Sequence, residues 1–395
     1  MQPSQMEPNS IKTQNLRRED VDWLRVLAML VVFVFHCGRF FDLEDWHIKN
    51  PQTSYVATLP IRITVQWMMP LFFLLSGMSS CYALSRHKTT KYIHARIKRL
   101  AVPFLFGTFV VIAPLQVYLE RVSHGQFHGS FLEFYPHYFE GWYAFGGNFA
   151  WMGIHLWYLE ILFVFSLVTL PLFICLNARG GRKLTSKIAG VLSRPGFIFL
   201  LAFPIAIMEF VANLPFIRPT ILGSEGFGGW SLLVYPVFFI LGYLIAADSH
   251  LGRVIEGQRI PALIGGISIT TVGFYLVESG YVLPEWLLAL LRAFNAWSWL
   301  VAICGFSSRH LNFSNRFLKY GNEAVLPFYI LHQTVILAIG YYIVQLDMAM
   351  SAKFLIIAAT SFLTIVALYE VLIRRVNLLR FLFGMKLKQS QIDLT

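Results

Sequence analysis

Residues 22–36 read Asp22-Trp-Leu-Arg25-Val-Leu-Ala-Met-Leu-Val-Val-Phe-Val-Phe-His36, an apolar stretch that carries two isolated ionisable side chains after its first residue. An α-helix turns about 100° and rises about 1.5 Å per residue, so Arg25 and His36 lie about three turns and about 16 Å apart on one face. In a hydrocarbon layer about 30 Å thick, Arg25 would lie near one surface and His36 near the middle. Because charge inside a membrane is costly, this pair indicates a functional site.

The composition is that of a polytopic membrane protein. The chain has 395 residues, of which 56% are hydrophobic and 13% charged, whereas an ordinary soluble domain has about 25% charged residues. The first hydrophobic run begins near Val21, is about twenty residues long and has no small-residue cleavage site. We therefore expect it to be retained as the first membrane span.

Hydrophobic runs of spanning length predict an all-α protein with about ten transmembrane helices. The transmembrane domain is expected at 21–376, between a tail at 1–20 and a tail at 377–395. The predicted spans are 22–41, 61–84, 100–120, 151–176, 197–214, 229–248, 260–278, 286–306, 324–345 and 353–373.

The basic residues give the orientation. With a cytoplasmic N-terminus, all but seven of the 32 Lys and Arg residues fall on the cytoplasmic side, as the positive-inside rule requires. Both termini are therefore predicted to be cytoplasmic. The net charge of +11 is spread over several such segments, which excludes nucleic acid as a partner. The seven exceptions are Arg39, Lys49, Arg62, Arg121, Arg218, Arg292 and Lys353.

Several common site types are missing from the sequence. The four cysteines lie in or beside apolar runs without CxxC spacing, which predicts free, buried thiols. No HExxH, EF-hand or clustered Cys/His motif is present, so we expect no metal and no tightly bound cofactor. The absence of GxSxG argues against a serine hydrolase. The cysteines are Cys37, Cys81, Cys175 and Cys304.

Two groups of residues are candidates for chemistry at the cytoplasmic end and the middle of the membrane. His36 could act as a general base or could hydrogen-bond between helices, and Asp22 is close enough along the helix to orient Arg25. Arg96 and Arg99 share a helix face and suit phosphate oxygens, although positive-inside topology alone also explains them. With Arg25, they form a possible phosphate-binding cluster.

Further polar residues are predicted near the depth of His36. Glu160, about 14 Å from Trp151 along the fourth span, could hold the imidazole in one tautomer or pair with another neighbour. His332 in the ninth span could line the same cavity. Glu209 and Arg292 are expected to form a structural ion pair. A further motif, Ser76-Gly77, indicates close helix packing.

Taken in order, these motifs resemble the acyltransferase 3 family of integral-membrane O-acyltransferases over about residues 20–384. The resemblance rests on Asp22-x-x-Arg25 with His36, Phe72-Phe73-Leu-Leu-Ser76-Gly77, Arg96-x-x-Arg99 before Pro103, His155-Leu-Trp157-Tyr158-Leu, and Tyr329-Ile-Leu-His332-Gln333. It implies an enzyme of a bacterial inner membrane that moves an acyl group from cytoplasmic acyl-coenzyme A to a hydroxyl of an extracytoplasmic glycan.

This resemblance fits a mechanism in which Arg25, Arg96 and Arg99 bind the coenzyme A phosphates and His36 is the general base, with Glu160 and His332 as further catalytic residues. Transfer is expected to be direct, although Cys37 leaves a covalent relay conceivable. The acyl group could be acetyl or succinyl. Residues 121–150 are expected to form an external lid or acceptor surface.

Two other functions are alternatives to acyl transfer. A polytopic transporter or flippase for a glycan or lipid could use His36, Glu160 and His332 as a proton relay. The sequence has no inverted repeat of broken helices, which argues against that function. A membrane scaffold would leave the intramembrane ionisable residues without a role.

Overall fold

The computed structural model describes residues 18–388; residues 1–17, most of the predicted N-terminal tail, and 389–395 lie outside the described residues. Over residues 18–388 the secondary structure is helical, with isolated bridges and no strand. The first half contains α1 (Glu19–Gly38), α2 (Tyr55–Val65), α3 (Met68–Arg86), α4 (Thr89–Arg96), a π-helix (Ile97–Ala101), α5 (Val102–Phe109), α6 (Ile112–Ser123), α7 (Phe131–His137), 3-10 turns Tyr143–Phe145 and Ile154–Leu156, α8 (Trp157–Val168), α9 (Leu170–Asn177) and α10 (Arg179–Leu192).

The second half continues with a 3-10 helix (Phe197–Leu201), α11 (Ala202–Ala212), α12 (Tyr235–Ala247), α13 (Ser249–Gly257), α14 (Arg259–Glu278), α15 (Glu285–His310), α16 (Arg316–Ile343), α17 (Met350–Leu368), a second π-helix (Tyr369–Ile373) and α18 (Asn377–Leu382). In the described chain, seven helical segments are long and apolar enough to cross a membrane, or nine if two bent pairs each count as one span. The shorter apolar helix Phe197–Ala212 coincides with the fifth predicted span. The prediction of an all-α polytopic membrane protein is confirmed.

Two predicted spans bend where the sequence interrupts the helix. The fourth turns by 49° between α8 and α9, where Pro171 lies at the start of α9 and lacks the backbone N–H that would continue the helix. The sixth turns by 106° between α12 and α13. There the Asp248 side chain accepts a hydrogen bond from the His250 backbone N–H at 2.9 Å and caps the new helix.

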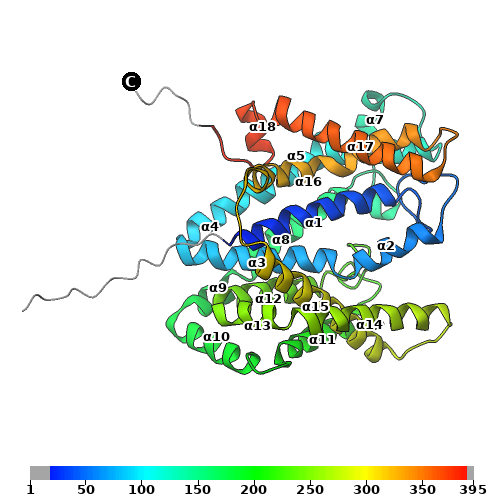
Figure 1. The fold of residues 1–395 in the computed structure, drawn as a ribbon. Coiled ribbons are helices and arrows are strands. Elements are labelled where there is room, and N and C mark those ends of the chain that lie inside the picture. The colour runs from blue at the N-terminus through cyan, green and yellow to red at the C-terminus, as the bar shows by residue number, and fades with distance from the viewer. Residues whose placement is uncertain (1–17, 389–395) are drawn as a thin grey trace, which may run out of the picture.

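Helix α1 lies at the centre of the bundle. It packs against α16 and α17 on one side and against α3 and α15 on the other (Figure 1). By contrast, only 17% of the spanning window of α14 and 28% of that of α17 is buried. These two helices expose apolar side chains such as Ile264 and Leu363, as lipid-facing helices do. The central position of α1 places Arg25 and His36 inside the protein.

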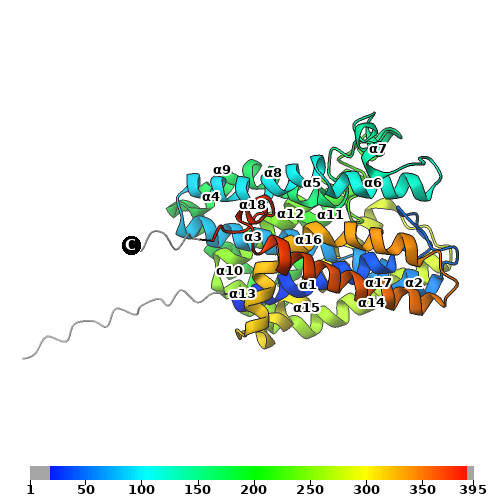
Figure 2. The ribbon, with the colours of Figure 1, turned by 90° about the horizontal axis from the view of Figure 1, so that it is seen from above.

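The first described helix begins, and the last one lies, at the same end of the molecule (Figures 1 and 2). Helices α4, α10 and α13, which hold many of the predicted cytoplasmic Lys and Arg residues, lie at that end as well. We call it the cytoplasmic end, as the positive-inside rule assigns it. Helix α18 falls within the predicted C-terminal tail 377–395 but packs against α5 and the second π-helix.

Helices α3 and α12 cross at two glycines. A Cβ atom at Gly77 would lie 1.9 Å from the Phe239 carbonyl oxygen, and one at Gly242 would lie 2.0 Å from the Leu74 carbonyl oxygen. Only glycine permits such an approach of two backbones. The close packing predicted from Ser76-Gly77 is confirmed.

Three of the four cysteines behave as predicted. Cys37, Cys81 and Cys304 are free and buried, whereas Cys175 is free and exposed. The prediction of a buried thiol is wrong for Cys175 because it lies on an outward face of α9, a helix that buries only Leu170 and Phe173.

Replacing Gly77 with Ala should lower the thermal stability of the detergent-purified protein, because the new methyl group meets backbone that cannot move aside. We expect a loss of about 1–3 kcal/mol, as for other overpacked sites. The matched control is Gly273→Ala in α14, where an added Cβ has no neighbour within 4 Å. Equal melting temperatures for the two variants would contradict this account of the crossing.

Candidate active site

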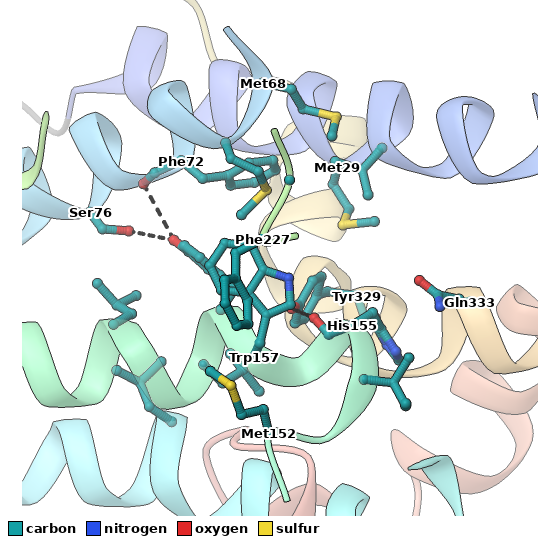
Figure 3. A pocket seen from close by; sticks show the side chains of 18 of the residues that line it. Met29, Met68, Phe72, Ser76, Met152, His155, Trp157, Phe227, Tyr329 and Gln333 are labelled. Carbon is teal, nitrogen blue, oxygen red and sulfur yellow. Dashed lines mark hydrogen bonds between the residues drawn. The ribbon is translucent and has the colours of Figure 1, made fainter. Parts of the chain in front are cut away.

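A cavity of about 1920 Å³ runs alongside α1 from the cytoplasmic end to the external end. Its lining includes Arg25 and Arg99 at the cytoplasmic end, His36 and His332 in the middle, and Trp46 at the external end. Figure 3 shows part of the wall, where Met29, Met68 and Phe72 lie across from His155, Trp157 and Tyr329. The cavity therefore joins the two groups of polar residues that the sequence singled out.

Arg25 is held at the cytoplasmic end by two neighbours. Its Nη1 donates to Asp22 Oδ1 at 3.0 Å, and its Nη2 donates to Ser79 Oγ at 2.9 Å. The predicted orientation of Arg25 by Asp22 is present. Ser79 comes from α3 and so ties the guanidinium to the opposite wall.

Arg96 and Arg99 flank the start of the first π-helix, Ile97–Ala101. Arg96 donates from Nη2 to Ser80 Oγ at 2.8 Å, and its guanidinium lies 4.8 Å from the centre of the Tyr92 ring. Arg99 lines the cavity close enough to Arg25 and Arg96 for the three charges to interact. The structure thus brings the three predicted arginines together, and the π-helix is a feature often found at functional sites.

The cavity is charged differently at its two ends. Among the described residues, Arg96, Arg99, Lys91 and Lys386 line the cytoplasmic end without forming an ion pair. At the external end, Arg39 pairs with Asp42 and Glu44. Nearby, burial lowers the pKa of Lys49, and its hydrogen bond to Asp42 partly offsets that effect. Within the described part of the chain, the cytoplasmic end of the cavity therefore offers an anionic ligand positive charge that no acidic residue compensates.

Two imidazoles meet in the middle of the cavity, and backbone carbonyls fix their tautomers. His332 Nδ1 lies 2.5 Å from the Tyr329 carbonyl oxygen, and His36 Nδ1 lies 2.9 Å from the Val32 carbonyl oxygen. Since a carbonyl only accepts, each Nδ1 carries a hydrogen. The single hydrogen on His36 Nδ1 is then shared between the Val32 carbonyl oxygen and His332 Nε2, which accepts across 3.2 Å. This assignment leaves the lone pair on His36 Nε2 free to take a proton.

A third imidazole, that of His155, has protein partners on both nitrogens. Its Nε2 lies 3.2 Å from the carbonyl oxygens of Tyr329 and Ile330, and its Nδ1 accepts from the Gln116 amide at 3.1 Å. The ring packs edge-on against His332, with centroids 5.0 Å apart. His155 therefore supports His332 rather than offering a free nitrogen. In the described part of the chain, no group of three His, Cys, Asp or Glu residues is arranged to hold a metal ion.

Glu160 is not part of this arrangement. It is absent from the cavity lining, and no hydrogen bond between described residues joins it to His36. Its Oε2 atom is buried without a hydrogen-bond partner in the described chain. The orienting role predicted for Glu160 is filled here by His332, which contacts His36 directly.

Ser76 contributes a hydroxyl to the cavity wall, in addition to the glycine contact beside it. Ser76 Oγ lies 2.7 Å from Tyr158 Oη, which also donates to the Phe72 carbonyl oxygen at 3.3 Å (Figure 3). Tyr158 and His155 belong to the His155-Leu-Trp157-Tyr158 motif, whose role the sequence did not reveal. His155 packs against His332 and Tyr158 against Tyr329, contacts that were unpredictable because they depend on how the 3-10 turn and α8 are rotated about the helix axis.

Arg292 and Glu209 form the predicted ion pair, with Nη1 and Oε1 2.6 Å apart. Arg292 also pairs with Glu225 at 2.5 Å and donates to the Gly229 carbonyl oxygen at 2.7 Å. Two carboxylates therefore compensate this one guanidinium at the cavity wall. Its contacts hold the loop before α12 against α15.

Comparison with known families identifies the class of protein. The family described as an acyltransferase domain matches residues 18–370, nearly the whole described chain. The fold and the cavity are therefore those of an integral-membrane acyltransferase, and the chain belongs to the acyltransferase 3 family.

Among curated proteins, the chain is similar to glucans biosynthesis protein C. The proteins of that name from Salmonella paratyphi A and Salmonella agona (strain SL483) are each 25% identical over 374 residues, which cover 93% of this chain and 94% of the relative. In this sequence, Trp46-His47 and Tyr369-Glu370 before Asn377 predict that likeness, and the comparison confirms it. No solved structure matches the chain.

Replacing Arg292 with Met should destabilise the protein, because it leaves the buried Glu209 carboxylate without its cation. We expect a loss on the order of 3 kcal/mol in thermal or denaturant unfolding. The double variant Arg292→Met with Glu209→Gln removes both charges and should recover most of that loss. A double variant no more stable than the single one would refute the pairing.

Proposed function

We propose that this acyltransferase moves a short acyl group from cytoplasmic acyl-coenzyme A to a hydroxyl of an extracytoplasmic glycan, at a bacterial inner membrane. The observation that carries the proposal is the continuous cavity, which has at one end two guanidiniums, those of Arg96 and Arg99, without an ion-pair partner among the described residues, and midway the His36 Nε2 atom, which is left without a hydrogen-bond partner there. A donor can enter from one side and an acceptor from the other, and they meet at His36.

The cytoplasmic end suits the phosphates of coenzyme A. Arg25 and Arg96 are fixed by hydrogen bonds that they donate to serine hydroxyls on α3, and Arg99 adds a third guanidinium. Guanidinium groups bind phosphate oxygens through paired, directional hydrogen bonds. The distance of about 16 Å from Arg25 to His36 along α1 can be spanned by the extended pantetheine arm, which would place the thioester beside the imidazole.

Acyl transfer from the thioester then needs a general base for the acceptor hydroxyl and a thioester carbonyl carbon placed within reach of that hydroxyl. His36 Nε2 takes the proton of the acceptor hydroxyl while the hydroxyl oxygen attacks the thioester carbonyl carbon. When the tetrahedral intermediate collapses, the carbon–sulfur bond breaks and the departing thiolate receives the proton from His36. His332 accepts the hydrogen bond from His36 Nδ1 throughout, so it stabilises the imidazolium form and holds the ring in place.

Direct transfer is supported by the surroundings of the alternative nucleophile. Cys37 follows His36 in the chain but is completely buried and does not line the cavity. A covalent relay through its thiol would require the helix to rotate. The acyl group is proposed to be acetyl or succinyl. The free carboxylate of a succinyl group would have to compete with Glu209 and Glu225 for Arg292.

Replacing His36 with Asn should reduce acyl transfer by at least about 100-fold, because the general base is lost. The measurement is release of free coenzyme A and acylation of an added gluco-oligosaccharide by the purified protein, with acetyl- and succinyl-coenzyme A assayed separately. His94→Ala is the matched control, since His94 is exposed on α4 and does not line the cavity. Normal transfer by the His36 variant would disprove its role, and proton-coupled uptake without turnover would favour a transporter.

Replacing Arg99 with Ala should weaken acyl-coenzyme A binding by about tenfold at low salt and by less at high salt, because ions screen charge contacts. Binding can be followed by equilibrium titration of the purified protein at several salt concentrations. Lys98→Ala provides a control on the same π-helix, since Lys98 is exposed and outside the cavity lining. If both variants lose the same affinity, bulk positive charge rather than the arginine cluster binds the donor.

A further inference from the structure

The external end of the cavity holds a further histidine, His47, which the mechanism above does not use. His47 lies in the loop between α1 and α2 and lines the cavity together with Trp46. Glu120, near the end of α6, bonds His47 Nδ1, although the two residues are 73 positions apart in the chain. The Ser123 hydroxyl also contacts the His47 carbonyl oxygen at 3.4 Å. These contacts fix the loop against α6.

The carboxylate of Glu120 is itself held by a tyrosine. Tyr143 Oη donates to Glu120 Oε2 at 2.6 Å, the same oxygen that bonds His47. Burial and the nearby Glu120 carboxylate raise the pKa of Tyr143, so its hydroxyl stays protonated and remains a donor. Together these contacts fix the orientation of the His47 ring. A carboxylate bonded to one nitrogen of a functional histidine commonly orients the other nitrogen toward its ligand in this way.

The other nitrogen of His47 is left for a ligand. Because the Glu120 carboxylate accepts from Nδ1, that nitrogen carries a hydrogen. Nε2 has no hydrogen-bond partner among the described residues, and the ring lies at the cavity wall. Whether the imidazole is neutral or protonated, Nε2 can form one hydrogen bond to a hydroxyl group, as acceptor or as donor.

Trp46 connects this histidine to the reaction centre. Its ring centroid lies 6.1 Å from that of His36 and 5.6 Å from that of His47, so both imidazoles neighbour the same tryptophan. A polyhydroxylated molecule bound at His47 can therefore present a second hydroxyl to His36.

Aromatic side chains surround the same opening. Trp151 and Phe145 line it with Tyr143 and Trp46, and the Phe145 side chain is 90% exposed. Arg121 holds this part of the external segment in place by donating to the Gly147 carbonyl oxygen at 2.7 Å and to Asn148 Oδ1 at 2.9 Å. Flat apolar faces beside a few fixed polar groups form the kind of site that binds a ring-shaped polar molecule.

We propose that the external opening is a binding subsite for a single sugar ring, in which His47 bonds a ring hydroxyl and the surrounding aromatic residues pack on its C–H face. Glu120 and Tyr143 are positioning residues that act through His47. This subsite would bind one sugar ring of the acceptor. The inference rests on the proposed function, in which the acceptor is a glycan. A lipid acceptor would need no directed hydrogen bond at this place.

The test is sugar binding measured without turnover. Short gluco-oligosaccharides are titrated into the purified full chain, and binding is followed by tryptophan fluorescence, since Trp46 and Trp151 line the subsite. His47→Ala and Glu120→Gln should each weaken binding by about tenfold, the effect of one lost hydrogen bond. Tyr143→Phe, which removes one hydroxyl, should weaken it by about threefold, and Glu120→Asp should retain more affinity than Glu120→Gln.

A neighbouring histidine–carboxylate pair provides the control. His137 and Glu140 form an ion pair of 2.9 Å in the same external segment, but they are exposed and outside the cavity lining. His137→Ala should bind the oligosaccharides as the unchanged protein does. The proposal would be overturned if the His47, Glu120 and Tyr143 variants bound the oligosaccharides as tightly as the unchanged protein does. It would also be overturned if the unchanged protein bound no oligosaccharide.

Kinetics separate this proposal from the proposed function. Correctly folded His47 and Glu120 variants should show a raised KM for the oligosaccharide and an unchanged affinity for acyl-coenzyme A. If instead acyl-coenzyme A affinity falls with oligosaccharide affinity, the residues act on the whole fold and the subsite is refuted. If the unchanged protein binds sugar but transfers no acyl group, the subsite stands and the proposed function fails.

Discussion

A histidine nitrogen that bonds a backbone carbonyl must carry a hydrogen, so the bond fixes the tautomer of the ring. The middle of the cavity depends on two such bonds. The carbonyl groups of Val32 and Tyr329 accept from Nδ1 of His36 and His332, and the two rings bond each other. In a hydrocarbon layer no water replaces these partners on the lipid side. The free nitrogen of His36 is therefore a product of helix packing, with α1 pressed against α16 at one depth.

The charge along the cavity complements this arrangement. Cations at the external end and along the wall are matched by acids, as with Arg39 and Arg292, whereas Arg96 and Arg99 have no acidic partner within residues 18–388. Their repulsion is a cost that the fold carries in the absence of an anionic ligand. Such a cost is typical of a binding site, because residues that only stabilise a fold are normally compensated.

Much of the fold and part of the site could be predicted from the sequence. Length and hydrophobicity located the spans, and helix periodicity placed Arg25 and His36 on one face. The count of residues from a membrane surface gives depth but not the rotation of a helix about its axis. His332 and Glu160 were therefore predicted at similar depth, yet only His332 faces His36. The contact of His47 with Glu120 could not be predicted, because loop conformation and the end of α6 bring together residues distant in the chain.

The continuous cavity with its basic cytoplasmic opening has a consequence for transport energetics. In the proposed reaction, acyl-coenzyme A would be retained by its phosphates where the arginines are, and the hydrated glycan would stay outside, so only the small acyl group would need to cross the layer. Group transfer from a thioester to an alcohol is downhill, and this reaction would carry material outward without a pump, an ion gradient or nucleotide hydrolysis. With His36 as the proposed base, about halfway along that path, the chemical step and the crossing would be one event.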